Sequence, residues 1–221
     1  MLMEDARRQV AEYGRQMSAA GLSIGTSGNL SVYGPELGLM AIGPSGLDYF
    51  QTEAEDVVVM KLDGTIVEGE RKPSSEAMLH AGIYRAKPFA RGIVHTHSTY
   101  CTTLAVLHEP LRAVHYAMAG IGAPEMPVAP YERFGSLELA RAVEETMAAT
   151  PAKGCIMANH GMVVCDTSLA AAFELAANCE WTAGIQWRAM CAGTPVPLTE
   201  EQMGDALSAF ATYGQPKEDE G

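Results

Sequence analysis

The chain lacks the features that would tie it to nucleic acid or to a membrane. Among its 221 residues, 15 are lysine or arginine and 27 are aspartate or glutamate, which gives a formal net charge of −12. Nucleic acid and anionic membranes both require a basic surface, so this balance argues against either partner. No apolar run approaches the roughly 20 residues that a membrane-spanning helix needs.

The cysteines lack the CxxC spacing that is typical of zinc-binding and redox-active sites. The five cysteines form no CxxC pair, and their odd number and apolar neighbours fit reduced, buried thiols: Cys101, Cys155, Cys165, Cys179 and Cys191. The first residues, MLMEDARRQVAEYG, carry charge early and lack the apolar stretch of a signal peptide. We therefore expect a cytoplasmic protein.

What is present indicates one globular domain. Apolar residues make up 48% of the chain and charged residues 19%, which is typical of a folded protein with a sizeable core. No internal repeat or low-complexity linker occurs, and no segment matches a dinucleotide fingerprint or a P-loop. We expect a single domain over residues 1–214, with a frayed tail over 215–221.

The spacing of apolar residues predicts an α/β fold. We expect helices over 4–20, 75–86, 98–107, 136–149, 168–192 and 200–211. We expect strands over 29–33, 38–42, 57–62, 65–67, 91–95, 112–118, 154–158 and 161–165, with a hairpin at Asp63-Gly64. Several strands are linked without a crossover helix, which favours a mixed or antiparallel sheet with helices on its faces.

The stretch RGIVHTHSTY, residues 91–100, places two of the six histidines two positions apart. In a strand, residues i and i+2 point to the same face, so His95 and His97 could converge on a metal ion. The motif alone is weak, because two solvated histidines at a strand end would give the same pattern.

Three loops are rich in small residues: GTSGNLS at 25–31, GPSG at 43–46 and KPSSE at 72–76. Glycine allows a ligand to approach the backbone closely, and serine adds a hydroxyl donor. The third loop opens a predicted helix, whose first N–H groups attract anions. Together the loops could bind a phosphate through neutral donors, although each alone could be a plain turn or helix cap.

A third histidine, His160, precedes Gly161 between two predicted strands, and Glu76 follows the Ser74-Ser75 pair. Three histidines and one carboxylate suit zinc or a similar divalent ion. A lone histidine at a strand junction is more often a core residue, so the prediction of a metal site depends on all four residues together. The other histidines are expected to be structural or at the surface: His80, His108 and His115.

GNLS, GPSG, KPSSE, HTHS and NHG, in this order, resemble the class II aldolase/adducin family over nearly the whole chain. The resemblance implies a three-layer α/β/α sandwich with a central, mostly antiparallel sheet, assembled as a homotetramer with sites at subunit boundaries. It also implies one zinc ion held by His95, His97 and His160. Glu76 would be both a displaceable ligand and the catalytic acid/base.

The resemblance assigns further residues to the site. The phosphate would be bound by Gly28, Asn29, Ser45, Gly46, Ser74 and Ser75. Phe134 would line the aldehyde side, while Tyr116 and Tyr213 would reach the substrate from the neighbouring subunit. Each of these three aromatic residues could instead be an ordinary packed side chain.

The implied reaction is cleavage of a ketose 1-phosphate similar to L-fuculose 1-phosphate, which yields dihydroxyacetone phosphate and a small aldehyde. A Schiff-base aldolase would need a buried lysine, and none of the five lysines lies in an apolar strand. Pentulose-phosphate 4-epimerases resemble this chain but usually carry aspartate at the position of Glu76. A sugar-phosphate dehydratase or decarboxylase, and a structural adducin-like head, which lacks the histidine set, are further alternatives.

Overall fold

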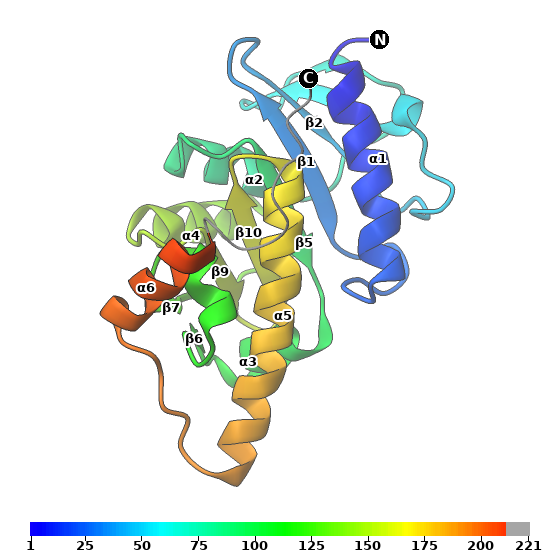
Figure 1. The fold of residues 1–221 in the computed structure, drawn as a ribbon. Helices are drawn as coiled ribbons and strands as arrows, with labels where there is room; N and C mark the ends of the chain where they lie inside the picture. Colours follow the sequence, from blue (N-terminus) through cyan, green and yellow to red (C-terminus); the bar gives the residue numbers. More distant parts are fainter. Residues whose placement is uncertain (211–221) are drawn as a thin grey trace, which may run out of the picture.

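The computed structural model describes residues 1–210, which form six α-helices and ten β-strands (Figure 1). The helices are α1 (Glu4–Ala19), α2 (Ala77–Ala86), α3 (Thr99–Leu107), α4 (Leu137–Ala148), α5 (Leu169–Ala192) and α6 (Glu200–Phe210). Two 3₁₀ helices, η1 (Ala54–Asp56) and η2 (Tyr116–Ile121), lie between them.

Eight strands form one sheet in the order β4-β3-β2-β1-β5-β10-β9-β8. Their bounds are β1 (Asn29–Gly34), β2 (Leu39–Ile42), β3 (Val58–Lys61), β4 (Ile66–Glu68), β5 (Gly92–Thr96), β8 (Val128–Ala129), β9 (Gly154–Met157) and β10 (Gly161–Asp166). Every neighbouring pair is antiparallel except β8 and β9. The remaining strands, β6 (Leu111–Arg112) and β7 (Glu125–Met126), form a separate antiparallel pair.

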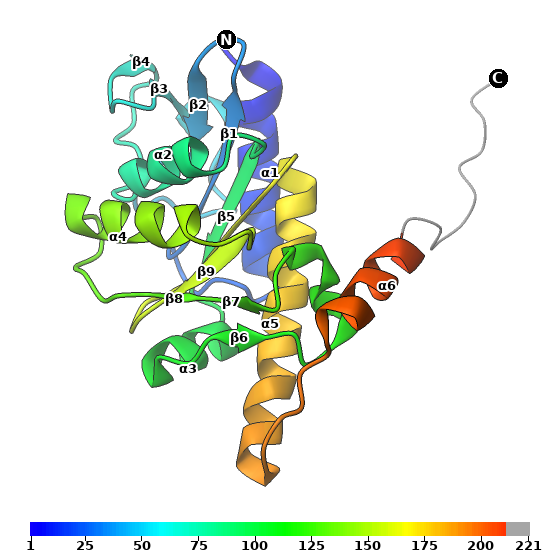
Figure 2. The same ribbon diagram turned by 90° about the vertical axis from the view of Figure 1, so that its left-hand side faces the viewer.

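The sheet lies between two layers of helices, as predicted. Figure 2 shows the sheet with α2 and α4 on one side and α1 and α5 on the other. Side chains of the central strands alternate between two apolar cores, as the pleat requires. In β5, Ile93 packs into the core under α2 and α4, whereas Val94 packs into the core that α1, α3 and α5 share.

Most predicted elements agree with the structure to within two residues, and the Asp63-Gly64 hairpin is present, with Gly64 at φ 95°. The strand predicted over 112–118 is wrong. Only Leu111–Arg112 is extended there, and His115 then caps η2 by accepting a hydrogen bond from the Ala117 amide at 3.1 Å. The η2 turn buries Met118 and Ile121 together, which an extended chain would place on opposite faces.

Within residues 1–210, no helix combines the length and the apolar character that crossing a bilayer requires.

Candidate metal and substrate site

Three histidines converge where β5 ends. The side chains of His95 and His97 lie on the same side of the strand as Ile93, toward α2, and their Nε2 atoms are 3.0 Å apart. The ring of His160 packs edge-on against both, with ring centroids 4.9 Å apart in each case. One ligand atom from each of the three rings lies within 4.8 Å of the others. The spacing of the HxH motif therefore places both imidazoles at one point, as the sequence predicted.

A tight turn brings His160 to this point. The His160 amide donates to the carbonyl of Met157 at 3.0 Å, and Asn159 adopts the left-handed conformation at φ 53°. Gly161 then lies so close to β5 that a Cβ atom would collide with the Thr96 carbonyl oxygen. Glycine at this position allows β10 to begin directly beside the end of β5.

A backbone contact sets the tautomer of His95. Its Nδ1 lies 2.8 Å from the carbonyl oxygen of Met162, an acceptor, so Nδ1 carries the hydrogen and donates it. The Nε2 lone pair is thereby directed at the point where the three rings meet. This arrangement, a ligand nitrogen fixed by a hydrogen bond from the other ring nitrogen, is typical of metal-binding histidines.

Glu76 completes the cluster from the residue that precedes α2. Its Oε2 lies 3.2 Å from Nε2 of His95, and its Oε1 lies 3.3 Å from Nε2 of His160. Oε1 is buried and has no hydrogen-bond partner among the described residues. A buried carboxylate oxygen left in this state is costly unless a cation or a proton meets it.

The charges of the cluster are strongly coupled. Burial alone would raise the pKa of Glu76, but the neighbouring His95, with contributions from His160 and Asn29, lowers it below the usual range. Burial lowers the pKa of His97 and of His160 to about 4, and protonation of His95 would add to both effects. His97 and His160 are therefore neutral near pH 7, the form that binds a metal.

These donors fit a borderline divalent cation. Three imidazole nitrogens and one carboxylate oxygen are a typical donor set for zinc, and the unbonded Oε1 of Glu76 faces the same region. Of the described residues, only His95, His97 and His160 form such a group.

A cavity of about 150 Å³ adjoins the histidines and is walled by all three small-residue loops. Its lining comprises Thr26, Ser27, Gly28, Asn29, Pro44, Ser45, Gly46, Ser74, Ser75, Glu76, His97, Phe134 and His160. None of these residues is lysine or arginine, so an anion in this cavity would be bound by hydroxyl, amide and backbone N–H groups. Every residue predicted to bind the phosphate lies on this wall.

Backbone hydrogen bonds hold two of these loops together. The Ser45 amide donates to the Lys72 carbonyl at 2.9 Å, and the Ser74 amide donates to the Gly43 carbonyl at 3.0 Å. In the first loop, Gly28 has φ 75°, and a Cβ atom there would lie 2.6 Å from the His95 carbonyl oxygen. These contacts join the second and third loops to each other and pack the first loop against β5.

One residue beside the site was not assigned a role from the sequence. His80 is fully buried, and its Nε2 lies 2.5 Å from Oδ1 of Asn29, whose Nδ2 donates to Glu76 Oε2 at 2.8 Å. Two signals could have identified it. His80 follows Glu76 by four residues in a helix, which places both on one face, and Asn29 and Ser31 are polar residues on one face of a buried strand.

The predicted aromatic residues are not all at the cavity. Phe134 lines it, and the adjacent Gly135, at φ 68°, packs against Ser75. Tyr116 lies elsewhere in the same chain, half exposed beside His115, with ring centroids 4.1 Å apart. Tyr213 lies outside the described residues.

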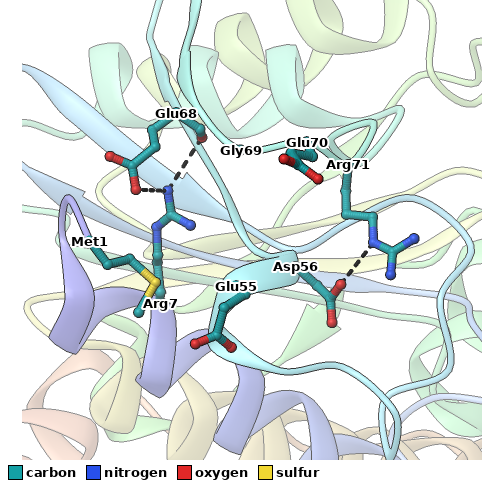
Figure 3. A pocket seen from close by; sticks show the side chains of 8 residues that line it. All are labelled: Met1, Arg7, Glu55, Asp56, Glu68, Gly69, Glu70 and Arg71. Atoms are coloured by element: carbon teal, nitrogen blue, oxygen red, sulfur yellow. Dashed lines mark hydrogen bonds and ion pairs between the residues drawn. The ribbon is translucent and has the colours of Figure 1, made fainter.

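A second cavity, of about 630 Å³, lies between the start of α1, η1 and the segment after β4 (Figure 3). Its two arginines are already paired. Arg7 contacts Glu68 at 2.8 Å and Arg71 contacts Asp56 at 2.7 Å, which leaves the cavity walls with an excess of carboxylates. This cavity is therefore poorly suited to a phosphorylated ligand.

The lysines also need one correction. Lys61, expected to lie outside the apolar strands, is the last residue of β3, where its side chain is exposed. Lys87 is buried, and burial lowers its pKa. It follows the last residue of α2, whereas Glu76 precedes the first, so the helix separates them by about 16 Å at 1.5 Å per residue. A lysine at that distance cannot reach a substrate held beside Glu76.

Comparisons with known proteins match most of the chain to one family. Residues 8–187 match the family model described as Class II Aldolase and Adducin N-terminal domain. The chain is 41% identical to a 5-deoxy-D-ribulose 1-phosphate aldolase of Bacillus thuringiensis serovar kurstaki, over 97% of this chain and 100% of the relative. It is 34% identical to an L-fuculose phosphate aldolase of Escherichia coli, over 94% of each. A solved L-fuculose 1-phosphate aldolase superposes with a TM-score of 0.89 at 38% identity, covering 96% of this chain and 98% of that one.

Proposed function

Because the chain belongs to the class II aldolase and adducin family, we propose that it is a metal-dependent aldolase that cleaves a ketose 1-phosphate into dihydroxyacetone phosphate and a small aldehyde. One observation carries the proposal. His95, His97 and His160 converge beside Glu76, and His97, His160 and Glu76 line a cavity that offers neutral hydrogen-bond donors and no lysine or arginine. A structural domain would have no need of this buried cluster.

In this proposal His95, His97 and His160 hold one divalent ion, and zinc is the metal that we expect from the donor set. When bound, such an ion supplies a Lewis acid for the ketose carbonyl.

Glu76 is the proposed acid/base. In cleavage it donates a proton to the carbon that becomes the hydroxymethyl group of dihydroxyacetone phosphate, and in the reverse direction it removes that proton. Its carboxylate is within 3.3 Å of two of the histidines, so it faces the place where the reacting carbon would lie.

The proposed phosphate site uses Ser45, Ser74 and Ser75 together with the backbone of Gly28 and Gly46. A negatively charged protein can bind phosphate in this way because locally oriented N–H and O–H dipoles determine the field in the site. Asn29 already donates to Glu76, so its side chain offers at most one further N–H to the phosphate.

The substrate that we favour ends in a methyl group. The relatives named above act, by their names, on 5-deoxy-D-ribulose 1-phosphate and L-fuculose phosphate, and both sugars have a terminal methyl carbon. Phe134 gives the cavity an apolar side that suits such an end.

A substrate panel tests the function. Zinc-loaded protein would be given 5-deoxy-D-ribulose 1-phosphate, L-fuculose 1-phosphate, D-ribulose 1-phosphate and unphosphorylated 5-deoxy-D-ribulose, and release of the three-carbon ketone would be measured. We expect kcat/KM for the methyl-ended phosphates to exceed that for D-ribulose 1-phosphate by about 10- to 100-fold and no more, because an apolar wall discriminates only weakly against an added hydroxyl. Ser75→Ala should raise KM for the phosphates by about 10- to 100-fold, as expected for a lost hydrogen bond to a charged group.

Equal kcat/KM with and without the phosphate would contradict the phosphate site. Conversion of a substrate to its epimer with no release of dihydroxyacetone phosphate would contradict the aldolase.

We also propose that the active unit is a homotetramer whose sites combine residues from two subunits. Tyr116 is the proposed donor and acceptor for the proton of the hydroxyl at the cleaved bond. Within one chain it lies with His115 and Trp181 along a separate cavity, not at the cavity that contains Glu76. A neighbouring subunit would have to bring its own Tyr116 to the site.

Mixing two inactive variants tests this arrangement. Tyr116→Phe and Glu76→Gln proteins would be unfolded together in equal amounts, refolded with zinc and assayed. Random assembly leaves about one quarter of the composite sites with both residues intact, so we expect about one quarter of the wild-type activity per site. Each variant refolded alone is the control. Mass spectrometry that shows mixed oligomers without recovered activity would mean that each site is built within one chain.

A further inference from the structure

A chain of buried hydrogen bonds runs from α2 through β1 to Glu76. Tyr84 OH lies 2.8 Å from Ser31 Oγ, and Ser31 Oγ lies 2.7 Å from Nδ1 of His80. His80 Nε2 lies 2.5 Å from Asn29 Oδ1, and Asn29 Nδ2 lies 2.8 Å from Glu76 Oε2. All five side chains are buried.

The carboxylate at one end fixes the direction of every bond. An ionised carboxylate can only accept, so Asn29 must direct its NH₂ group toward Glu76 and its Oδ1 toward His80. Oδ1 can only accept, so the hydrogen of the His80 imidazole is on Nε2. Its Nδ1 then accepts from the Ser31 hydroxyl, which in turn accepts from Tyr84. No member of the chain is left with two donors or two acceptors facing each other.

His80 is neutral in this arrangement, as the tautomer requires. Complete burial lowers the pKa of His80 to about 3, and the charge of His95 adds to this effect. The His80 side chain does not contact the cavity itself. It is fully buried, and it is absent from the cavity wall, which Asn29 and Glu76 form.

We propose that His80 is a positioning residue for the aldolase reaction, acting through Asn29 to hold Glu76 by its Oε2 atom. Oε2 then lies between Asn29 Nδ2, at 2.8 Å, and His95 Nε2, at 3.2 Å, while Oε1 is left without a hydrogen bond at 3.3 Å from His160 Nε2. Without this hydrogen bond the carboxylate could turn part of the way about its Cγ–Cδ bond, and the oxygen that carries the proton would then point away from the reacting carbon. The inference rests on the proposed role of Glu76 as the acid/base.

Two substitutions of similar size separate positioning from packing. His80→Gln places an amide NH₂ near the position of Nε2, so it can still donate to Asn29. His80→Asn is one carbon shorter, so it can reach Ser31 but not Asn29. We expect His80→Asn to lower kcat by about 10- to 100-fold, the effect typical of residues that orient a catalytic or metal-binding group through hydrogen bonds. KM for the ketose 1-phosphate and zinc content should change by less than about twofold, and His80→Gln should recover most of the loss in kcat.

A double-mutant cycle gives the decisive result. In a Glu76→Gln background, His80→Asn should lower the residual kcat no further, because its effect passes through the group already removed. If His80→Asn lowers kcat by the same factor in both backgrounds, the positioning role is wrong. It is equally wrong if both His80 variants lower kcat and melting temperature in parallel, or if His80→Asn has wild-type kcat.

The outcomes separate this inference from the proposed function. Wild-type turnover in Glu76→Gln alone would overturn the role of Glu76, and with it this proposal. A large loss in Glu76→Gln combined with additive effects would overturn the positioning role alone. Should His80→Asn fail to fold, the same cycle would be run with His80→Phe, which fills the imidazole volume and cannot donate to Asn29.

Discussion

Replacing His95 by alanine is expected to remove the metal and the activity together. His95 is fully buried between His97, His160 and Glu76, so its loss leaves two imidazoles to hold the ion. A Lewis acid contributes several kcal/mol to stabilising the charge that develops on the substrate. We therefore expect turnover to fall by about three orders of magnitude or more. Zinc content by elemental analysis should fall from one per chain to a small fraction of that value.

A second ligand variant and a histidine outside the cluster serve as controls. His97 is only partly buried, so His97→Ala should lose the metal with less disturbance of the core. His108 is exposed after α3, with its Nε2 2.7 Å from Asn159 Oδ1, so His108→Ala removes a contact next to His160 but no ligand and should retain one zinc per chain. Circular dichroism and melting temperature would establish that each variant is folded. A folded His95→Ala protein with a full complement of metal would contradict the ligand assignment.

Glu76→Gln is expected to lower kcat by about 10²- to 10⁴-fold, the usual contribution of a positioned acid or base, while metal is retained. The substitution keeps the size of the side chain, and its amide oxygen can still accept from Asn29. It removes the group that carries the proton. Because the three histidines remain, zinc content should stay close to one per chain, which distinguishes this variant from His95→Ala.

Isotope exchange would isolate the proposed proton transfer from bond cleavage. Wild-type protein given dihydroxyacetone phosphate in D₂O, without an aldehyde, should exchange a hydrogen of the hydroxymethyl carbon. Glu76→Gln should lose this exchange. Tyr116→Phe should keep the exchange and lose cleavage, because its proposed proton belongs to the other product. Turnover and exchange near wild-type values in Glu76→Gln would mean that the base is another residue.

Much of the fold follows from local sequence rules. Helix α4 begins at Ser136, whose hydroxyl accepts from the Leu139 amide at 3.1 Å, and α5 begins at Ser168 in the same way. Such caps mark helix starts in the sequence, so the predicted and observed bounds differ by one residue. The mostly antiparallel sheet followed from strands linked without crossover helices. Its strand order did not, because pairing depends on contacts between distant segments.

Short elements were the ones that the sequence did not reveal. Strands β7 and β8 have two residues each, too few for any alternation to be recognised. The segment after Arg112 has apolar residues that fit an extended chain as well as a single helical turn. The decision between them depends on where Met118 and Ile121 are buried, which is a property of the whole core.

The clustering of the three histidines was predicted from the sequence, but the hydrogen bonds behind Glu76 were not. His95, His97 and His160 were recognisable because metal-binding chemistry restricts which residue types can serve. His80 was not, because its spacing from Glu76 and the polar pair on β1 indicate a role only once β1 is known to lie beside α2. Its partner Asn29 stands directly opposite His95 in the pairing of β1 with β5, a relation that appears only once the two strands are aligned.

That pairing makes the site depend on whether residue positions are odd or even. Asn29 and Ser31 on β1, and Ile93 and His95 on β5, all face α2, while Leu30 and Val94 face the opposite core. A slip of β5 by one residue would turn His95, and His97 just after the strand, toward α5 and put Val94 or Thr96 beside Glu76. Substitution of most residues in these strands should therefore disturb the site less than a change in strand length. A single residue inserted into or deleted from either strand would move the histidines away from Glu76, although the composition of the chain would hardly change.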